Sequence, residues 1–109
     1  MKSLSAGCET YTLVELSGDA DATSSHRLRE VLDDEIDRNP RAMIIDLSGL
    51  RFLDSRALHV ILLANRELDR RGYVLALAAP RASVARVLRL TGTDQLVPVY
   101  ASVDEAIRG

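Results

Sequence analysis

The sequence has 109 residues, with 14 lysines and arginines against 16 aspartates and glutamates, so its formal charge is -2. A chain of this length folds as a single domain, and its charge argues against a dedicated nucleic-acid binder, which would carry a basic surface. Its one cysteine, Cys8, excludes an internal disulfide. Residues 1–10 lack the apolar core of a signal peptide, and no apolar run approaches the roughly 18 residues that span a bilayer. The sequence therefore predicts a cytoplasmic protein that binds neither a membrane nor a nucleic acid.

The first third of the chain predicts two strands and a helix. Residues 11–17 are typical of a strand that ends at Gly18, and residues 4–9 predict a weaker edge strand. Three hydroxyl residues then offer N-caps for a helix: Thr23, Ser24 and Ser25. The apolar face of this helix repeats with helical spacing at Leu28, Val31, Leu32 and Ile36. The helix ends at Asn39-Pro40, because the residue before a proline is driven out of the helical region.

The middle third predicts a buried strand, a loop and a second helix. Residues 42–47 form a continuous apolar run of strand length, as expected of a strand that is covered on both faces. We expect a short loop to follow, with three side chains tucked under the sheet edge: Leu50, Phe52 and Leu53. The second helix is predicted to begin at Asp54 or Ser55, to run to Arg71 and to stop at Gly72.

The last third predicts two more strands and two more helices. Residues 74–78 read as a buried strand, and Ser83 is placed to cap a third helix that ends at Thr91-Gly92. Residues 96–100 predict a short strand, and Ser102 with Glu105 forms a capping box for a helix over 103–107. This alternation predicts an α/β fold with a mixed sheet of four or five strands, three main helices and a short C-terminal helix.

No catalytic, metal or cofactor site is predicted. His26 lies on a polar helix face, and the acidic run at residues 33–37 is typical of a solvated helix surface. No cluster of cysteine, histidine and carboxylate residues has metal-ligand spacing, and no glycine-rich phosphate loop follows a strand. We therefore expect a protein that is not an enzyme and that carries no metal or cofactor.

Ser55 is the candidate residue for a covalent modification, because it lies at a predicted helix N-terminus. A helix N-terminus presents free backbone N–H groups and the positive end of the helix dipole, so a phosphoryl group there would be accommodated without local unfolding. The alternative is that Asp54 or Ser55 is only an N-cap, a role worth about 1 kcal/mol.

Three blocks of sequence resemble the STAS domain, the family of anti-sigma factor antagonists. Residues 52–58 (FLDSRAL) resemble its signature, which leads into the second helix, and residues 18–21 (GDAD) resemble its turn after the second strand. Residues 90–92 (LTG), together with 96–106, resemble its C-terminal stretch. The blocks occur in the family's order and spacing and cover nearly the whole chain.

The resemblance implies a STAS-type sheet and a regulatory switch. In the phospho-switch members of the family, the serine after the signature aspartate is phosphorylated by a serine kinase that is also the anti-sigma factor, and phosphorylation ends the binding of the two proteins. That serine corresponds to Ser55. The implied partner-binding residues form one accessible patch: Asp21, Asp54, Arg56, Leu58 and His59. Helical spacing also places Leu58 on one apolar face with Ile61, Leu62 and Leu68, which predicts a core position for it. We expect a bacterial regulator that is a monomer or a weak dimer.

The signature also departs from the family pattern. Arg56 replaces the usual second hydroxyl residue, while Ala57 and His59 stand where glycines are common and would fill space that a kinase backbone could use. Arg56 can pair with Asp54 or with a phosphate on Ser55. These departures leave open a STAS scaffold or transport-accessory protein that is never phosphorylated. A small-molecule or nucleotide sensor is a third alternative.

Overall fold

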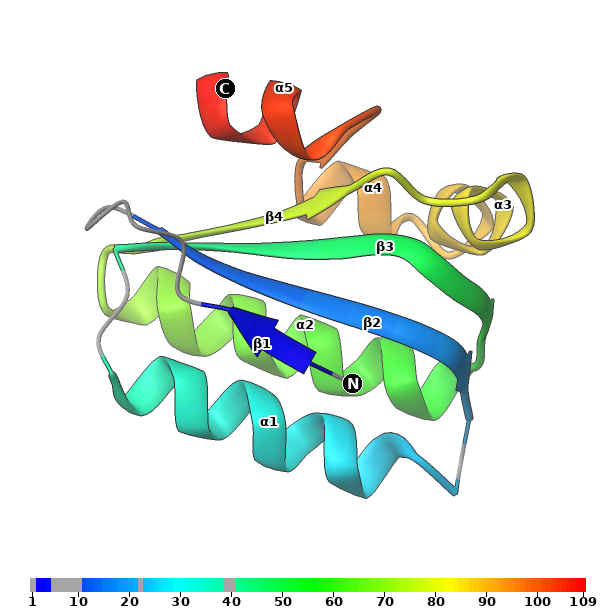
Figure 1. The fold of residues 1–109 in the computed structure, drawn as a ribbon, viewed down its shortest axis with the longest axis horizontal. Coiled ribbons are helices and arrows are strands. Elements are labelled where there is room, and N and C mark those ends of the chain that lie inside the picture. Colours follow the sequence, from blue (N-terminus) through cyan, green and yellow to red (C-terminus); the bar gives the residue numbers. More distant parts are fainter. Residues whose placement is uncertain (1, 5–10, 22, 39–40) are drawn as a thin grey trace.

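The computed structural model describes residues 2–4, 11–21, 23–38 and 41–109 (Figure 1). Strands and helices alternate through most of the chain, as the sequence pattern predicts. The elements are, in order, β1 (Lys2–Leu4), β2 (Thr12–Ala20), α1 (Ser25–Asp37), β3 (Ala42–Leu53), α2 (Ser55–Arg70), β4 (Val74–Ala78), α3 (Ala82–Leu90), α4 (Thr93–Leu96), β5 (Val99–Tyr100) and α5 (Val103–Arg108).

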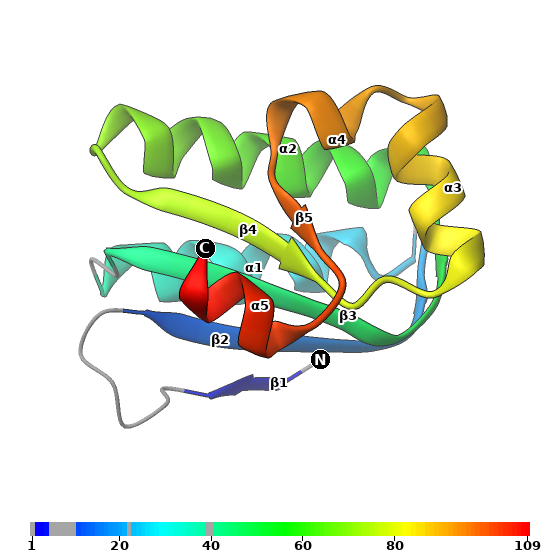
Figure 2. The same ribbon diagram turned by 90° about the horizontal axis from the view of Figure 1, so that it is seen from above.

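One five-stranded sheet in the order β1-β2-β3-β4-β5 organises the fold. β1 is antiparallel to β2, and the remaining neighbours are parallel, so the sheet is mixed, as predicted. α1 and α2 lie side by side against one face of the sheet, and α5 lies over the other (Figures 1 and 2). The predicted α/β class is confirmed.

The main core lies between the sheet and the pair α1 and α2. Alternate residues of β3 point into it, because side chains alternate between the two faces of a strand. The helices contribute residues three and four positions apart, which share one helical face. Its fully or almost fully buried members include Val14, Leu28, Leu32, Met43, Ile45, Leu47, Ile61 and Leu68.

β2 and β3 are longer than the sequence pattern predicts. β3 continues to Leu53 instead of ending near residue 47, because it stays paired with β2 as far as the pair Ala20–Leu53. The register shifts between Glu15 and Ser17 and again after Gly18, and each shift inserts one extra residue on the β3 side. The predicted loop before α2 is therefore strand.

Burial differs from the prediction along this extension of β3. Leu50 and Leu53 are buried, as expected, with exposures of 1% and 2%. Phe52 is 51% exposed, so the expectation that it tucks under the sheet edge is wrong. A strand that alternates its side chains cannot bury two consecutive residues on the same face.

Several boundaries also differ from the predictions. The N-cap of α3 is Arg81 rather than Ser83, and Ser83 lies inside the helix, where its hydroxyl donates to the carbonyl of Arg51 at 3.3 Å. The predicted strand over 96–100 is reduced to Val99–Tyr100, because the segment before it forms α4. At the N-terminus, β1 is Lys2–Leu4, and the rest of the predicted edge strand, including Cys8, lies outside the described residues.

Other local signals act as predicted. Gly72 follows α2 with a φ of 79°, in the left-handed region that ends helices. The hydroxyl of Ser102 accepts a hydrogen bond from the amide of Glu105 at 3.1 Å and caps α5.

Candidate interaction site at the start of α2

The first turn of α2 is tied to the end of β2. Asp54 is the N-cap, and its carboxylate accepts a hydrogen bond from the amide of Ala57 at 2.9 Å. The amide of Asp54 donates to the carbonyl of Ala20, the last residue of β2, also at 2.9 Å. These bonds hold the start of α2 at the edge of the sheet where the parallel strands end.

Ser55 is the first residue of α2 and is exposed to solvent. The sequence offers Asp54 and Ser55 as possible N-caps, and the structure uses Asp54. Within the described part of the chain the Ser55 hydroxyl takes part in no hydrogen bond. The structure thus places this hydroxyl in the first turn of the second helix, as predicted, and presents it to solvent.

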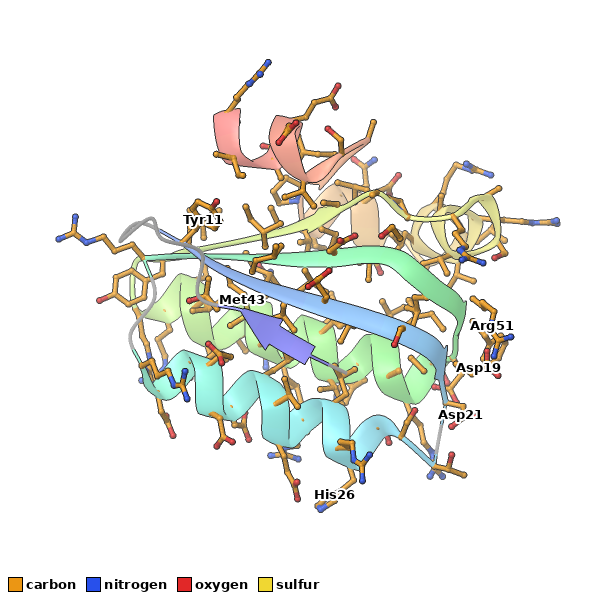
Figure 3. The ribbon with its side chains drawn as sticks, in the orientation of Figure 1. Tyr11, Asp19, Asp21, His26, Met43 and Arg51 are labelled. Carbon is orange, nitrogen blue, oxygen red and sulfur yellow. The ribbon has the colours of Figure 1, made fainter. Side chains whose placement is uncertain are left out.

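Asp21 lies at the same edge, directly after β2. Ala20 pairs with Leu53, so Asp21 and Asp54 each follow one member of a neighbouring pair. Figure 3 shows Asp21 at this end of the sheet, near Asp19 and Arg51, which form an ion pair at 3.6 Å. The prediction that the turn after β2 and the start of α2 lie together is confirmed.

The carboxylate of Asp21 organises the turn that leads into α1. It accepts hydrogen bonds from the hydroxyl of Thr23 at 2.6 Å and from the amides of Thr23 at 3.0 Å and Ser24 at 3.3 Å. The hydrogen bond from the Thr23 hydroxyl is the largest cause that lowers the pKa of Asp21 below its ordinary value of 3.8. Asp21 therefore stays ionised near neutral pH and fixes the turn. Ser24 is the N-cap of α1, but its side chain makes no capping bond.

A groove of about 480 Å³ lies between the first turns of α1 and α2. The predicted residues Ser55, Arg56 and His59 line one side of it. The other side comes from α1 and includes Arg29, which the sequence reading did not single out. The sequence gives only a weak signal for Arg29. The spacing of four residues places Ser25 and Arg29 on one face of α1, but it does not show that this face lies next to α2. The full lining is Ser25, His26, Arg29, Ser55, Arg56, His59 and Val60.

The model of the STAS domain matches residues 5–106 of this chain. The chain belongs to the STAS domain family. A curated relative from Paenibacillus polymyxa, an anti-sigma F factor antagonist, is 30% identical over 89 residues, which are 81% of this chain and 76% of the relative. Anti-sigma factor antagonists of this family are regulators and not enzymes, which agrees with the sequence expectation.

Solved structures of other proteins share the fold. An anti-sigma factor antagonist from Mycobacterium paratuberculosis has a TM-score of 0.88 at 25% identity, with 98% of this chain and 91% of that chain covered. SpoIIAA, a Bacillus protein, has a TM-score of 0.81 in its unphosphorylated form, at 21% identity with coverages of 97% and 91%. Its phosphorylated form has a TM-score of 0.73, at 20% identity with coverages of 98% and 97%.

Two residues of the STAS signature are buried, which corrects the sequence reading. Leu58 is 5% exposed and belongs to the core, as its apolar helical face predicts, so its predicted place in the accessible patch is wrong. Ala57 is 0% exposed, so its methyl group packs inward and takes no space from a partner. His59, by contrast, is exposed beside Ser55. The helix turns by about 100° per residue, so one side of the signature, with Ala57 and Leu58, faces the core, while Ser55, Arg56 and His59 face solvent.

Arg56 is exposed, and within the described residues it forms no ion pair with Asp54, whose carboxylate caps the helix instead. Among the described residues there is no group of three or more histidine, cysteine, aspartate or glutamate side chains that could hold a metal ion. In the same part of the chain, no helix combines the length and the apolarity that crossing a membrane requires. The candidate site is thus an exposed surface of mainly polar side chains around the Ser55 hydroxyl.

Proposed function

We propose that this STAS domain is an anti-sigma factor antagonist that acts in the bacterial cytoplasm. In the proposed cycle, the unphosphorylated chain binds an anti-sigma factor that is also a serine kinase. The kinase phosphorylates Ser55, and the phosphorylated chain is released. Asp21, Asp54, Arg56 and His59 belong to the proposed contact surface.

The position of the Ser55 hydroxyl carries this proposal. It is exposed in the first turn of α2, and it is not used as the cap, because Asp54 holds that position. A kinase can therefore reach the hydroxyl without unfolding the helix. Capping by the neighbouring residue separates the two roles, so a modification of Ser55 leaves the helix start intact.

The electrostatics of the helix start explain why a phosphate would act on binding rather than on folding. A phosphate adds about -1.5 to -2 charges at neutral pH, and a helix N-terminus stabilises negative charge. The penalty then falls on the interface, where the added charge must be desolvated. SpoIIAA, which shares the fold, has been solved in phosphorylated and unphosphorylated forms, which supports a fold that tolerates the group.

Affinity capture with three baits tests the proposal. The wild-type chain, Ser55→Ala and Ser55→Asp are used to capture proteins from the source cell, and any kinase-like partner is then purified. The partner is incubated with the wild-type chain and ATP, phosphate is located by mass spectrometry, and the affinities of both forms are measured. We expect phosphate on Ser55, at least tenfold weaker binding of the phosphorylated form, and unimpaired binding of Ser55→Ala.

Ala82→Asp is the matched control, because it adds the same charge at an exposed position that, like Ser55, is the first residue of its helix. It should bind as the wild type does, whereas Ser55→Asp should bind more weakly. Equal affinity of the two phosphorylation states, or no phosphate on Ser55 with a partner that binds, would contradict the switch. Capture of a membrane transporter subunit instead would favour the transport-accessory alternative.

A further inference from the structure

The groove between α1 and α2 is lined by arginine and histidine side chains around the Ser55 hydroxyl. α1 contributes His26 and Arg29, and α2 contributes Arg56 and His59. No carboxylate side chain lines this groove. Two arginines from two different helices thus border the same space as the exposed serine.

Helical spacing explains why these residues meet. Ser55 and His59 are four residues apart on α2, and Ser25 and Arg29 are four apart on α1, so each pair shares one helical face. The two helices lie side by side, with their N-termini at the same end of the molecule (Figure 1). The two faces therefore oppose each other across the first turns.

Within the described residues, carboxylates engage the guanidinium groups of Arg29 and Arg56 only weakly or not at all. Arg29 contacts Asp33 on its own helix at 3.8 Å, with both side chains 64% exposed, a loose pair of the kind that contributes little. Asp54 is engaged with the amide of Ala57, and Glu30 with His26 at 2.9 Å. Arg56 has no ion pair within the described residues.

We propose that a phosphate on Ser55 is held across this groove by Arg29 of α1 and Arg56 of α2, with His59 as a further hydrogen-bond donor. This inference deepens the proposed function, because it rests on phosphorylation of Ser55 and describes how this chain receives the group. Guanidinium groups bind phosphate oxygens through charge-assisted hydrogen bonds.

The clamp changes what phosphorylation does to the surface. Two arginines offset most of the charge of one phosphate, so the phosphorylated groove is close to neutral instead of strongly negative. The same contacts join the first turns of α1 and α2. A partner that binds this surface could then no longer contact Arg29 and Arg56, and it would also have to accommodate the phosphate.

The test uses the full chain with phosphoserine inserted at position 55 during translation, so it does not depend on finding a kinase. The phosphate is titrated by ³¹P NMR in the folded chain and again in urea. In urea, the second pKa of the phosphate should lie near its ordinary value of about 6. A nearby cation favours the doubly charged phosphate, so we expect the phosphate pKa in the folded chain to be about 0.5 to 1 unit lower than in urea. The double variant Arg29→Gln, Arg56→Gln should lose most of this difference.

Arg66→Gln is the matched control, because Arg66 is exposed on α2 and does not line this groove. It should keep the full difference, and thermal unfolding should show that all variants are folded. Equal phosphate pKa values in the folded and unfolded wild type, or an unchanged difference in the double variant, would overturn the clamp. Failure of every candidate kinase to modify Ser55 would contradict the proposed function and leave this result intact.

Discussion

The amide of Asp54 donates a 2.9 Å hydrogen bond to the carbonyl of Ala20, and through this bond two separate segments share one surface. Ala20 ends β2, and Asp54 caps α2. The turn with Asp21 and the helix start with Ser55 are consequently fixed relative to each other by the backbone. Side chains on this surface can therefore be substituted or modified without moving the backbone that holds them. A binding surface that contains a modifiable residue requires this property.

The capping role of Asp54 predicts different stabilities for two neighbouring substitutions. Asp54→Ala removes the acceptor for the Ala57 amide and should lower the free energy of unfolding by about 1 kcal/mol, within a range of 0.5–2. Ser55→Ala removes no capping bond and should change it by less than about 0.5 kcal/mol. Urea unfolding of both variants measures this. A cost at Ser55 equal to that at Asp54 would show that the serine caps the helix.

The hydrogen bonds to Asp21 predict a titration that depends on one hydroxyl. The carboxyl should titrate below pH 3.8, and Thr23→Val, which removes the hydroxyl, should raise its pKa toward that value. Because the folded-state pKa is depressed, the stabilisation by Asp21 is fully present above the unfolded pKa and is lost as the pH falls through the folded one. NMR titration of the Asp21 side chain measures its pKa in the wild type and in the Thr23→Val variant. Thr23→Ser keeps the hydroxyl and should keep the low pKa, so a rise in that variant would contradict this account.

Gly49 permits the close approach of β3 to β2 at the first register shift. A Cβ at this position would lie 2.9 Å from the carbonyl oxygen of Leu16 and 3.2 Å from the Cβ of Ser17. Gly49→Ala should therefore lower the free energy of unfolding by about 1–3 kcal/mol, because the strand backbones must separate. Chemical denaturation provides the measurement. The exposed neighbour Ser48→Ala serves as the control and should stay within about 0.5 kcal/mol of the wild type.

Ala79 follows β4 with a φ of 56°, in the left-handed region, where an L side chain costs roughly 1–2 kcal/mol. Ala79→Gly relieves this strain, but glycine also gains more conformational entropy in the unfolded chain, which offsets part of the effect. We therefore expect the free energy of unfolding to rise by up to about 1 kcal/mol. Ala85→Gly, inside α3, should instead destabilise the protein by about 1 kcal/mol. Thermal unfolding of the two variants should shift in opposite directions, and a loss of stability in Ala79→Gly would show that the strain account is wrong.

The boundaries of α2 were predictable because their signals are local. An acidic N-cap and a glycine in the left-handed conformation act through backbone groups only a few residues away, so Asp54 and Gly72 specify the helix without reference to the rest of the chain. The same holds for Ser102, which caps α5. The place of Ser55 in the first turn of α2 follows from this local geometry.

The composition of the site was only partly predictable. Arg56 and His59 border the groove, as their places in the signature suggest, but Leu58 faces the core, and Arg29 enters from another helix. Sequence proximity to Ser55 does not decide which side of a helix meets the sheet. That is decided by the packing of α1 and α2 against the same face.

The sequence by itself determined the α/β class, the order of the strands and main helices along the chain, and the helix start that contains Ser55. These features depend on periodicity and on caps, which involve only neighbouring residues. Only the tertiary structure decided that β3 runs on to Leu53, where residues 48–53 carry weak strand signals of their own. Their extended backbone is stabilised by hydrogen bonds to β2, which is distant in sequence. The same long-range pairing brings Asp21 to Asp54, a proximity that depends on the register of two strands and not on either segment alone.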